Sequence, residues 1–203
     1  MASTKFVVAL GNPGRQYAAT RHNVGFMVAS ALRRKWVASP RDAFGGLLTD
    51  ARVSRPAQEP VRVMVLEPQT YMNCSGRAVR AMADFYKAAP QDILVVLDDM
   101  ALPLGQLRVR PDGTAGGHNG LADIVAAMGT TGIPRLRVGI GGPPGRMEWK
   151  DYVLAPFRSD EQDVIGPTIE IAASAVEDWV FLGIRAVMDR YNRKPEDRQA
   201  ENR

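Results

Sequence analysis

The sequence predicts a single-domain α/β sandwich, and two observations lead to that prediction. Short apolar runs alternate along the chain with longer segments in which apolar residues recur at helical spacing. No internal repeat or linker-like stretch divides the 203 residues, which suffice to bury one substantial core. We therefore assign residues 1–191 to one catalytic domain and expect the charged, aperiodic residues 192–203 to form a disordered tail.

The first apolar run, residues 6–10, predicts a buried strand because aliphatic and β-branched side chains follow one another without alternation. The turn at 11–14 ends that strand. Thr20 is expected to cap a helix whose inner stripe is Val24, Met27, Val28, Ala31 and Leu32. His22 and Asn23 therefore lie in the first helical turn, near the carboxyl end of a strand, where α/β folds hold ligands.

The next part of the chain predicts two strands and a helix. Residues 45–54 and 61–66 are expected to be strands, joined by the segment 56–60. A polar turn over residues 67–76 then precedes a helix. The apolar stripe of that helix consists of Val79, Met82, Ala83 and Tyr86.

A further apolar run, residues 93–97, predicts a buried strand that ends in Asp98 and Asp99. A carboxylate at the end of a core strand orients a catalytic group, ligates a metal or caps the following turn. The sequence of this segment alone favours the cap.

Two later strand-like segments, residues 106–110 and 135–140, carry basic side chains at alternate positions. Alternation places the two arginines of each segment on one face of its strand. These residues are Arg108 with Arg110, and Arg135 with Arg137.

The remaining segments are two glycine-rich loops and two helical regions. The loop 113–120 leads into a short helix, and the loop 141–145 contains two prolines. Residues 158–191 predict the last helical region, with Ser159 as its cap and a break at Gly166-Pro167.

Composition is that of an ordinary globular protein, with 45% apolar and 24% charged residues. The net charge of +4 favours an anionic partner, and the excess of arginine over lysine suits bidentate phosphate contacts. Codon bias in the source genome explains that excess equally well, so charge alone assigns no partner.

The single cysteine, Cys74, excludes an internal disulfide and predicts a reducing, cytoplasmic setting. No apolar stretch approaches the ~20 residues of a membrane helix, and the first apolar run is too short for a signal peptide. Cysteine and histidine are too few for a structural zinc site. We expect a cytoplasmic protein without a membrane partner.

Both histidines of the chain, His22 and His118, are followed by asparagine and, within three residues, by glycine. One such sequence reads equally well as a helix start with an amide cap. Two of them, which together use every histidine present, favour a functional site.

Four stretches of the chain together resemble the bacterial-type peptidyl-tRNA hydrolase family. Their order and spacing match over about the first 140 residues, and RLRVGIG (135–141) supports the match. The C-terminal part matches mainly in helical character. The four stretches are GNPGRQYAATRHNVG (11–25), TYMNCSG (70–76), DDMALPLGQLRVR (98–110) and GTAGGHNGL (113–121).

The resemblance implies a fold, an activity and a partner. The fold is a three-layer sandwich in which helices flank a twisted mixed β-sheet. The activity is hydrolysis of the ester between a peptide and the 3′-terminal ribose of tRNA, which recycles tRNA from prematurely released peptidyl-tRNA. The family acts as a monomer, needs no metal or cofactor, and contacts the acceptor stem, 3′ end and peptide of its substrate.

The resemblance also implies roles for individual residues. His22 matches the catalytic histidine, and Asp98 matches the carboxylate that holds it. The amides of the cleft match Asn12, Asn73 and Asn119. Side chains that line or border the cleft match Tyr17, Tyr71, Met72 and His118. The basic residues for the tRNA match Arg108, Arg110, Arg135 and Arg137.

These residue types suit ester hydrolysis by water. A neutral imidazole accepts a proton from water, and a carboxylate on its other nitrogen fixes the tautomer. Asparagines donate to an oxyanion or to peptide carbonyls without adding charge. Because a free α-amine offers no such carbonyl, aminoacyl-tRNA would be spared. We favour direct attack by water because neither Ser75 nor Cys74 has an evident base beside it.

Two other functions remain open from the sequence. A metal hydrolase would use His22, His118, Asp98 and Asp99, although these lack the His-x-x-x-His spacing of a helical zinc site. A nucleic-acid-binding module would hold phosphate with its glycine-rich turns, although no Gly-Lys-Ser/Thr follows them.

Overall fold

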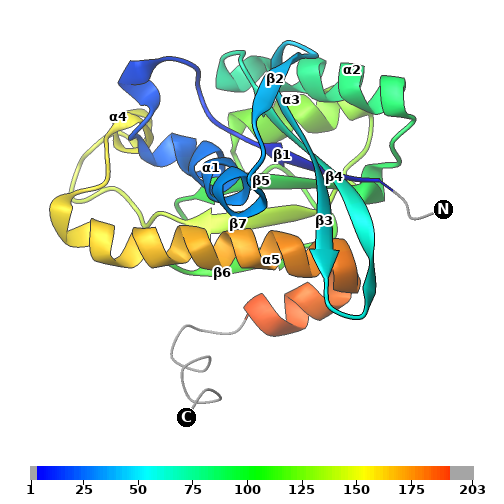
Figure 1. Cartoon of the computed structure of the whole chain (residues 1–203). Helices are drawn as coiled ribbons and strands as arrows, with labels where there is room; N and C mark the ends of the chain where they lie inside the picture. The colour runs from blue at the N-terminus through cyan, green and yellow to red at the C-terminus, as the bar shows by residue number, and fades with distance from the viewer. Residues whose placement is uncertain (1–3, 193–203) are drawn as a thin grey trace.

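One mixed seven-stranded sheet forms the middle layer of the molecule in a computed structural model that describes residues 4–192 (Figure 1). The strands are β1 (Lys5–Ala9), β2 (Pro40–Ala43), β3 (Gly46–Arg55), β4 (Gln58–Pro68), β5 (Ile93–Asp99), β6 (Leu107–Arg110) and β7 (Arg135–Gly139). Their order across the sheet is β2-β3-β4-β1-β5-β7-β6. Apart from Asn192, the predicted tail lies outside the described residues.

Helices cover both faces of the sheet, which confirms the predicted three-layer sandwich (Figure 1). One apolar cluster packs α1 and α5 on one face, and a second packs α2 and α3 on the other. The helices are α1 (Val24–Trp36), α2 (Ser75–Tyr86), α3 (Asn119–Met128), α4 (Trp149–Leu154) and α5 (Ser159–Tyr191). The 3₁₀ turns are η1 (Arg15–Tyr17), η2 (Arg21–Asn23), η3 (Met72–Cys74) and η4 (Pro90–Asp92).

The central strands run parallel, and this decides where the site lies. β1 pairs in parallel with β4 and β5, and β5 pairs in parallel with β7. The carboxyl ends of these strands therefore share one edge of the sheet, and the segments after β1 and β4 meet the end of β5 there. The outer pairs β2–β3, β3–β4 and β6–β7 are antiparallel.

Gly25 allows α1 to begin directly against the ends of β1 and β5. A Cβ at this position would lie 2.4 Å from the carbonyl oxygen of Leu10 and 2.7 Å from that of Val96. Such distances are far below contact, so only glycine permits this approach. Because His22 lies three residues earlier, the approach sets where the imidazole meets β5.

Two elements, β2 and α4, are absent from the sequence prediction. β2 is a short, exposed edge strand of proline and charged residues, and it lacks the apolar alternation that identifies strands. α4 has six residues and buries only Tyr152, so it has no helical stripe. The segment 56–60 is also shorter than expected, since β4 starts at Gln58.

Thr20 holds the N-cap position of η2 without a capping hydrogen bond from its side chain, and the predicted cap at Ser159 is wrong because Arg158 holds that position. The hydroxyl of Thr20 donates to the carbonyl of Tyr17 at 2.8 Å, and the chain forms η2 before α1 begins. Ser159 starts α5, but the side chain of Glu161 satisfies the helix end by accepting from the N–H of Arg158 at 2.7 Å. The carboxylate of Glu161, and not the hydroxyl of Ser159, therefore makes the side-chain hydrogen bond at the start of α5.

The predicted break at Gly166-Pro167 is also wrong, because α5 continues through it. Ile165 and Ala172 are buried on either side, and their packing outweighs the lost hydrogen bond of the proline. The kink falls instead at Gly183, whose φ of 79° is open to glycine without strain. The last turns of the helix then point in another direction (Figure 1).

No helix among residues 4–192 combines the length and the apolar character that crossing a membrane requires.

Gly25→Ala is expected to lower the free energy of unfolding by about 1–3 kcal/mol, because the new methyl group meets backbone oxygens that cannot move aside. Urea unfolding at neutral pH measures the change. Gly166→Ala in α5 is the matched control, since nothing lies within 4 Å of a Cβ there. Equal stability of the two variants would contradict the close approach of α1.

Candidate active site

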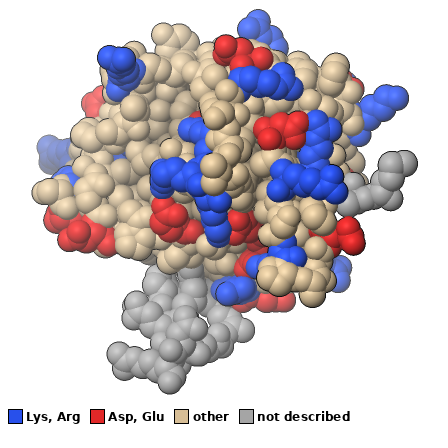
Figure 2. All heavy atoms as spheres, viewed as in Figure 1, with Lys and Arg blue, Asp and Glu red and all other residues tan. Residues whose placement is uncertain are grey.

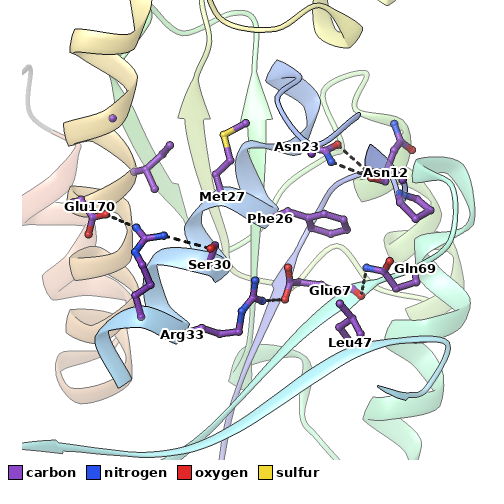
Figure 3. Close-up of a pocket in the computed structure, with 16 residues that line it drawn as sticks. Asn12, Asn23, Phe26, Met27, Ser30, Arg33, Leu47, Glu67, Gln69 and Glu170 are labelled. Atoms are coloured by element: carbon purple, nitrogen blue, oxygen red, sulfur yellow. Dashed lines mark hydrogen bonds and ion pairs between the residues drawn. The ribbon is translucent and has the colours of Figure 1, made fainter. Parts of the chain in front are cut away.

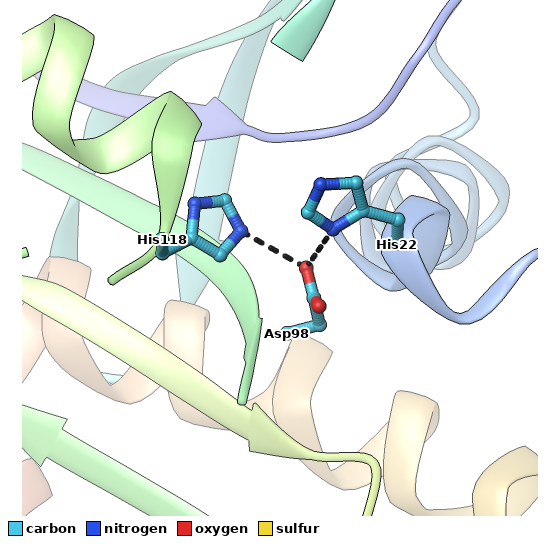
Figure 4. Close-up of side chains that lie close together, drawn as sticks. All are labelled: His22, Asp98 and His118. Carbon is cyan, nitrogen blue, oxygen red and sulfur yellow. Dashed lines mark hydrogen bonds and ion pairs between the residues drawn. The ribbon is translucent and has the colours of Figure 1, made fainter. Parts of the chain in front are cut away.

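A histidine and an aspartate that are far apart in sequence meet at the carboxyl edge of the sheet (Figure 4). His22 lies in η2, and Asp98 is the sixth residue of β5. The Nδ1 atom of His22 is 2.8 Å from Oδ1 of Asp98. The imidazole remains partly open to solvent, whereas the carboxylate side chain is 3% exposed.

A second histidine reaches the same carboxylate oxygen from the other side (Figure 4). The Nε2 atom of His118, at the start of α3, is 3.0 Å from Oδ1 of Asp98. The two imidazole centroids are 5.0 Å apart. Gly116 and Gly117 have positive φ, so the loop turns sharply enough to direct His118 at the strand end.

The tautomer of His118 follows from its second hydrogen bond. The backbone N–H of Leu121 donates to Nδ1 of His118 at 3.3 Å, so that nitrogen carries a lone pair and caps α3. The proton is therefore on Nε2, which donates to Asp98.

Asp98 is held as a carboxylate. Burial raises the pKa of its carboxyl group, but the electrostatic and hydrogen-bond interactions with His118, and then with His22, outweigh burial and hold that pKa well below its ordinary value. An ionised carboxylate requires a donor from His22, which places a proton on Nδ1. The Nε2 atom of His22 is left with a lone pair, as a general base requires.

Asn12, three residues after the end of β1, is fixed by three hydrogen bonds. Its backbone N–H donates to Oδ1 of Asn23, and its carbonyl accepts from Nδ2 of Asn23, both at 2.9 Å (Figure 3). Its Oδ1 accepts from the backbone N–H of Met72 at 2.9 Å. The side-chain amide of Asn12 therefore has its N–H groups left to donate to a ligand.

The other predicted cleft residues come from segments beside these groups. Met72 is buried in η3 and lies so close to Gly120 of α3 that a Cβ there would be 2.5 Å from its sulfur. Asn73 in η3 and Asn119 at the start of α3 are exposed. Tyr71 is 63% exposed, Tyr17 is half-buried in η1, and Cys74 is an exposed free thiol.

The predicted arginines share one face of the β6–β7 pair. Arg108 lies directly opposite Arg137, and Arg110 lies opposite Arg135. Among residues 4–192, neither Arg108 nor Arg110 takes part in an ion pair. Arg137 pairs with Asp99, the neighbour of the site carboxylate.

Arg135 differs from the expectation that it contacts tRNA, because it is 2% exposed. Its Nη1 donates to the carbonyls of Gly113 at 2.8 Å and Thr114 at 3.0 Å. Further donors reach Ile133 and Thr131. Arg135 thus shapes the loop that leads to His118, and its guanidinium is occupied by backbone carbonyls.

Two residues of the site carry no role in the sequence prediction. Asn23 binds the backbone of Asn12 through two hydrogen bonds, and Arg21 is the buried first residue of η2. Both lie in the run Thr20-Arg21-His22-Asn23, so the sequence points to them only through their adjacency to His22.

A separate groove of about 470 Å³ lies on the far side of Asn12, where α1 faces α5 and the β3–β4 hairpin (Figure 3). Phe26, Met27 and Ile169 are among its lining residues, with Arg33 and Glu67 as an ion pair. His22, Asp98 and His118 are not among them. The chemistry of Figure 4 therefore lies outside this groove.

The same three side chains are the one set of His, Cys, Asp and Glu residues within the described chain that is grouped closely enough to hold a metal ion. Binding through Nε2 of His118 would move its proton to Nδ1, where the N–H of Leu121 already donates. Asp99, the fourth ligand of the metal hypothesis, is occupied by Arg137 and by the N–H of Ala101. The hydrogen bonds favour an imidazole–carboxylate pair over a metal centre.

Comparisons with known proteins agree with one another. A family model described as peptidyl-tRNA hydrolase matches residues 6–200. A peptidyl-tRNA hydrolase from Rhodopirellula baltica is 47% identical over 189 residues, which make up 93% of this chain and 97% of that protein. One from Symbiobacterium thermophilum is 48% identical, with coverage of 93% and 98%. The crystal structure of peptidyl-tRNA hydrolase from Acinetobacter baumannii has a TM-score of 0.86 at 35% identity, with coverage of 95% and 96%.

Excess zinc is expected to leave the thermal unfolding midpoint of the protein unchanged, because the proton on Nε2 of His118 occupies the position a metal would need. A ligand that bound the folded state would raise the midpoint by mass action. Differential scanning calorimetry with and without zinc measures this. A rise that the His118→Asn variant loses would instead support a metal centre.

Proposed function

The chain belongs to the peptidyl-tRNA hydrolase family, and we propose that His22 activates the water that hydrolyses the peptide–ribose ester. The observation that carries this proposal is the 2.8 Å contact between Nδ1 of His22 and the Asp98 carboxylate. It fixes the imidazole with Nε2 unprotonated and directed away from Asp98.

In the proposed reaction, Nε2 of His22 removes a proton from a water molecule as its oxygen attacks the ester carbonyl. Asp98 stabilises the imidazolium that forms. When the tetrahedral intermediate collapses, the imidazolium returns the proton to the departing ribose oxygen. The hydroxyl group of the water thus becomes part of the carboxyl group of the released peptide, and its other proton ends on the ribose hydroxyl of the tRNA.

Three amides are assigned to the substrate side of the site. Asn12 offers only N–H groups, because Met72 uses its carbonyl oxygen. A donor of this kind suits the oxyanion or the carbonyl of an acylated amino group. Asn73 and Asn119 are exposed on the adjoining η3 and α3 segments and are assigned to the peptide backbone. Tyr17, Tyr71 and His118 border the same cleft in this proposal.

The acceptor stem is assigned to the arginines of the β6–β7 pair that are not buried, the exposed Arg110 and the half-buried Arg108 and Arg137. The cations on the face that α1 and α5 cover differ from these arginines, because carboxylates lie among them (Figure 2). Two ion pairs join those helices, Arg34 with Glu170 and Lys35 with Glu177.

Location and oligomeric state complete the proposal. We infer a monomer in the cytoplasm, because ribosomes release peptidyl-tRNA there and the chain has a single cysteine. Light scattering after size exclusion measures the state, and a mass near twice 22.2 kDa would contradict it.

His22→Ala is expected to lower the release of tRNA from N-acetylated aminoacyl-tRNA by about 10²–10⁴-fold, the usual contribution of a positioned base. Binding of tRNA should persist, which would separate an enzyme from a binding module. Cys74→Ser is the control, since that exposed thiol has no assigned role. Retention of more than a tenth of wild-type turnover by His22→Ala would refute the assignment.

Replacing Arg108 and Arg110 together by alanine is expected to raise KM for a full tRNA substrate and to leave a minimal ester substrate unaffected. The dependence of log affinity on log salt should also become shallower, by about 0.7–0.9 per lost phosphate contact. The control replaces Arg34 and Arg62, which are ion-paired. Equal effects of both double variants would count against the assigned face.

A further inference from the structure

We propose that Arg21 is a positioning residue, which holds His22 against Asp98 by tying η2 to the connection between α4 and α5. This inference rests on the proposed role of His22 as the base. Among residues 4–192, Arg21 has no hydrogen bond or ion pair with Asp98 or with the His22 ring, so it acts on the reaction only through the backbone it holds.

Both terminal nitrogens of the Arg21 guanidinium bind the α4–α5 connection or the first turn of α5, whereas its buried Nε has no hydrogen-bond partner. Its Nη1 donates to the carbonyls of Ala155 at 3.2 Å and Pro156 at 2.5 Å. Its Nη2 lies 2.6 Å from Oε2 of Glu161, in an ion pair with side chains only 4% and 11% exposed. A guanidinium buried this deeply is a fixed anchor.

The backbone of the same turn is tied to the same connection. The N–H of Arg21 donates to the carbonyl of Ala155 at 3.0 Å. Thr20 and Pro156 form an isolated antiparallel bridge. The turn that carries His22 is therefore held at its first residue by both main chain and side chain.

Tyr152 extends the anchor back to the sheet edge. Its ring centroid lies 4.3 Å from the guanidinium carbon of Arg21, and its hydroxyl donates to the carbonyl of Ile140 at 2.7 Å. The N–H of Ile140 donates to the carbonyl of Asp99 at 3.0 Å, one residue after Asp98. These contacts thus connect η2, which carries His22, through Tyr152 to β5, which carries Asp98.

Such an anchor is needed because η2 is held poorly by itself. It is a three-residue turn, and no side chain caps its start. Asn23 clamps its end to Asn12, and Arg21 clamps its beginning. His22 lies between the two clamps, and its contact with Asp98 depends on both. Displacement of a catalytic group by about 1 Å costs about 10²-fold in rate.

The test removes the anchor without leaving a buried charge. Arg21→Met combined with Glu161→Gln is expected to lower kcat for N-acetylated aminoacyl-tRNA by about 10²-fold with KM changed less than about twofold. The matched control is Arg33→Met with Glu67→Gln, which removes another largely buried arginine–glutamate pair that does not touch η2. The control should keep wild-type kcat.

A second readout does not depend on turnover. The chain has two histidines, so nitrogen-15 NMR resolves the tautomer of each ring. His22 is expected as the Nδ1–H form in the wild type and in the control, and as a mixture in the Arg21 variant. His118 should stay in the Nε2–H form in all of them, because the hydrogen bond from the N–H of Leu121 to its Nδ1 is not changed by these substitutions.

Tyr152→Phe keeps the test decisive if the double variant fails to fold. It removes the hydroxyl that donates to the carbonyl of Ile140, and we expect a several-fold lower kcat with unchanged KM. Wild-type kcat and an unmoved His22 tautomer in a folded anchor variant would overturn the inference, as would unchanged kcat in Tyr152→Phe. Failure of the proposed function is distinguishable, since His22→Ala would then retain turnover.

Discussion

The site depends on one carboxylate oxygen that accepts from two imidazoles. Oδ1 of Asp98 binds both rings, yet the rings are made different by what each contacts on its far side. The N–H of Leu121 fixes His118 as a donor to Asp98 through Nε2, whereas Nε2 of His22 is left as an acceptor. One buried carboxylate therefore orients two chemically identical side chains differently, one with a free acceptor nitrogen and one as a donor.

The fold delivers this arrangement through strand direction and close packing. Parallel β1, β4 and β5 bring three separate loops to one edge of the sheet. Gly25 then lets α1 start against the strand ends, and Asn12 fastens the loop after β1 to η3. Each link is a backbone contact or a buried hydrogen bond, so the geometry is set before any substrate arrives.

Much of this was predictable from the sequence, and the rest was not, for physical reasons. Apolar runs and helical stripes predicted the central strands and α1 to α3, and the family resemblance predicted that His22 meets Asp98. Burial of Arg21 and Arg135 was hidden, because arginine is usually exposed and its carbonyl partners carry no sequence signal. The sequence placed the break of the last helix at Gly166-Pro167 instead of at Gly183, because it does not show the tertiary packing that outweighs the local effect of Pro167.

The lone thiol of Cys74 has a practical consequence. It is exposed and is the immediate neighbour of Asn73, on the turn that Asn12 holds by its amide oxygen. A maleimide dye would therefore label the native protein at one defined point, with no engineered cysteine. Its emission would report arrival and departure of the nucleic acid in real time, independently of bond cleavage.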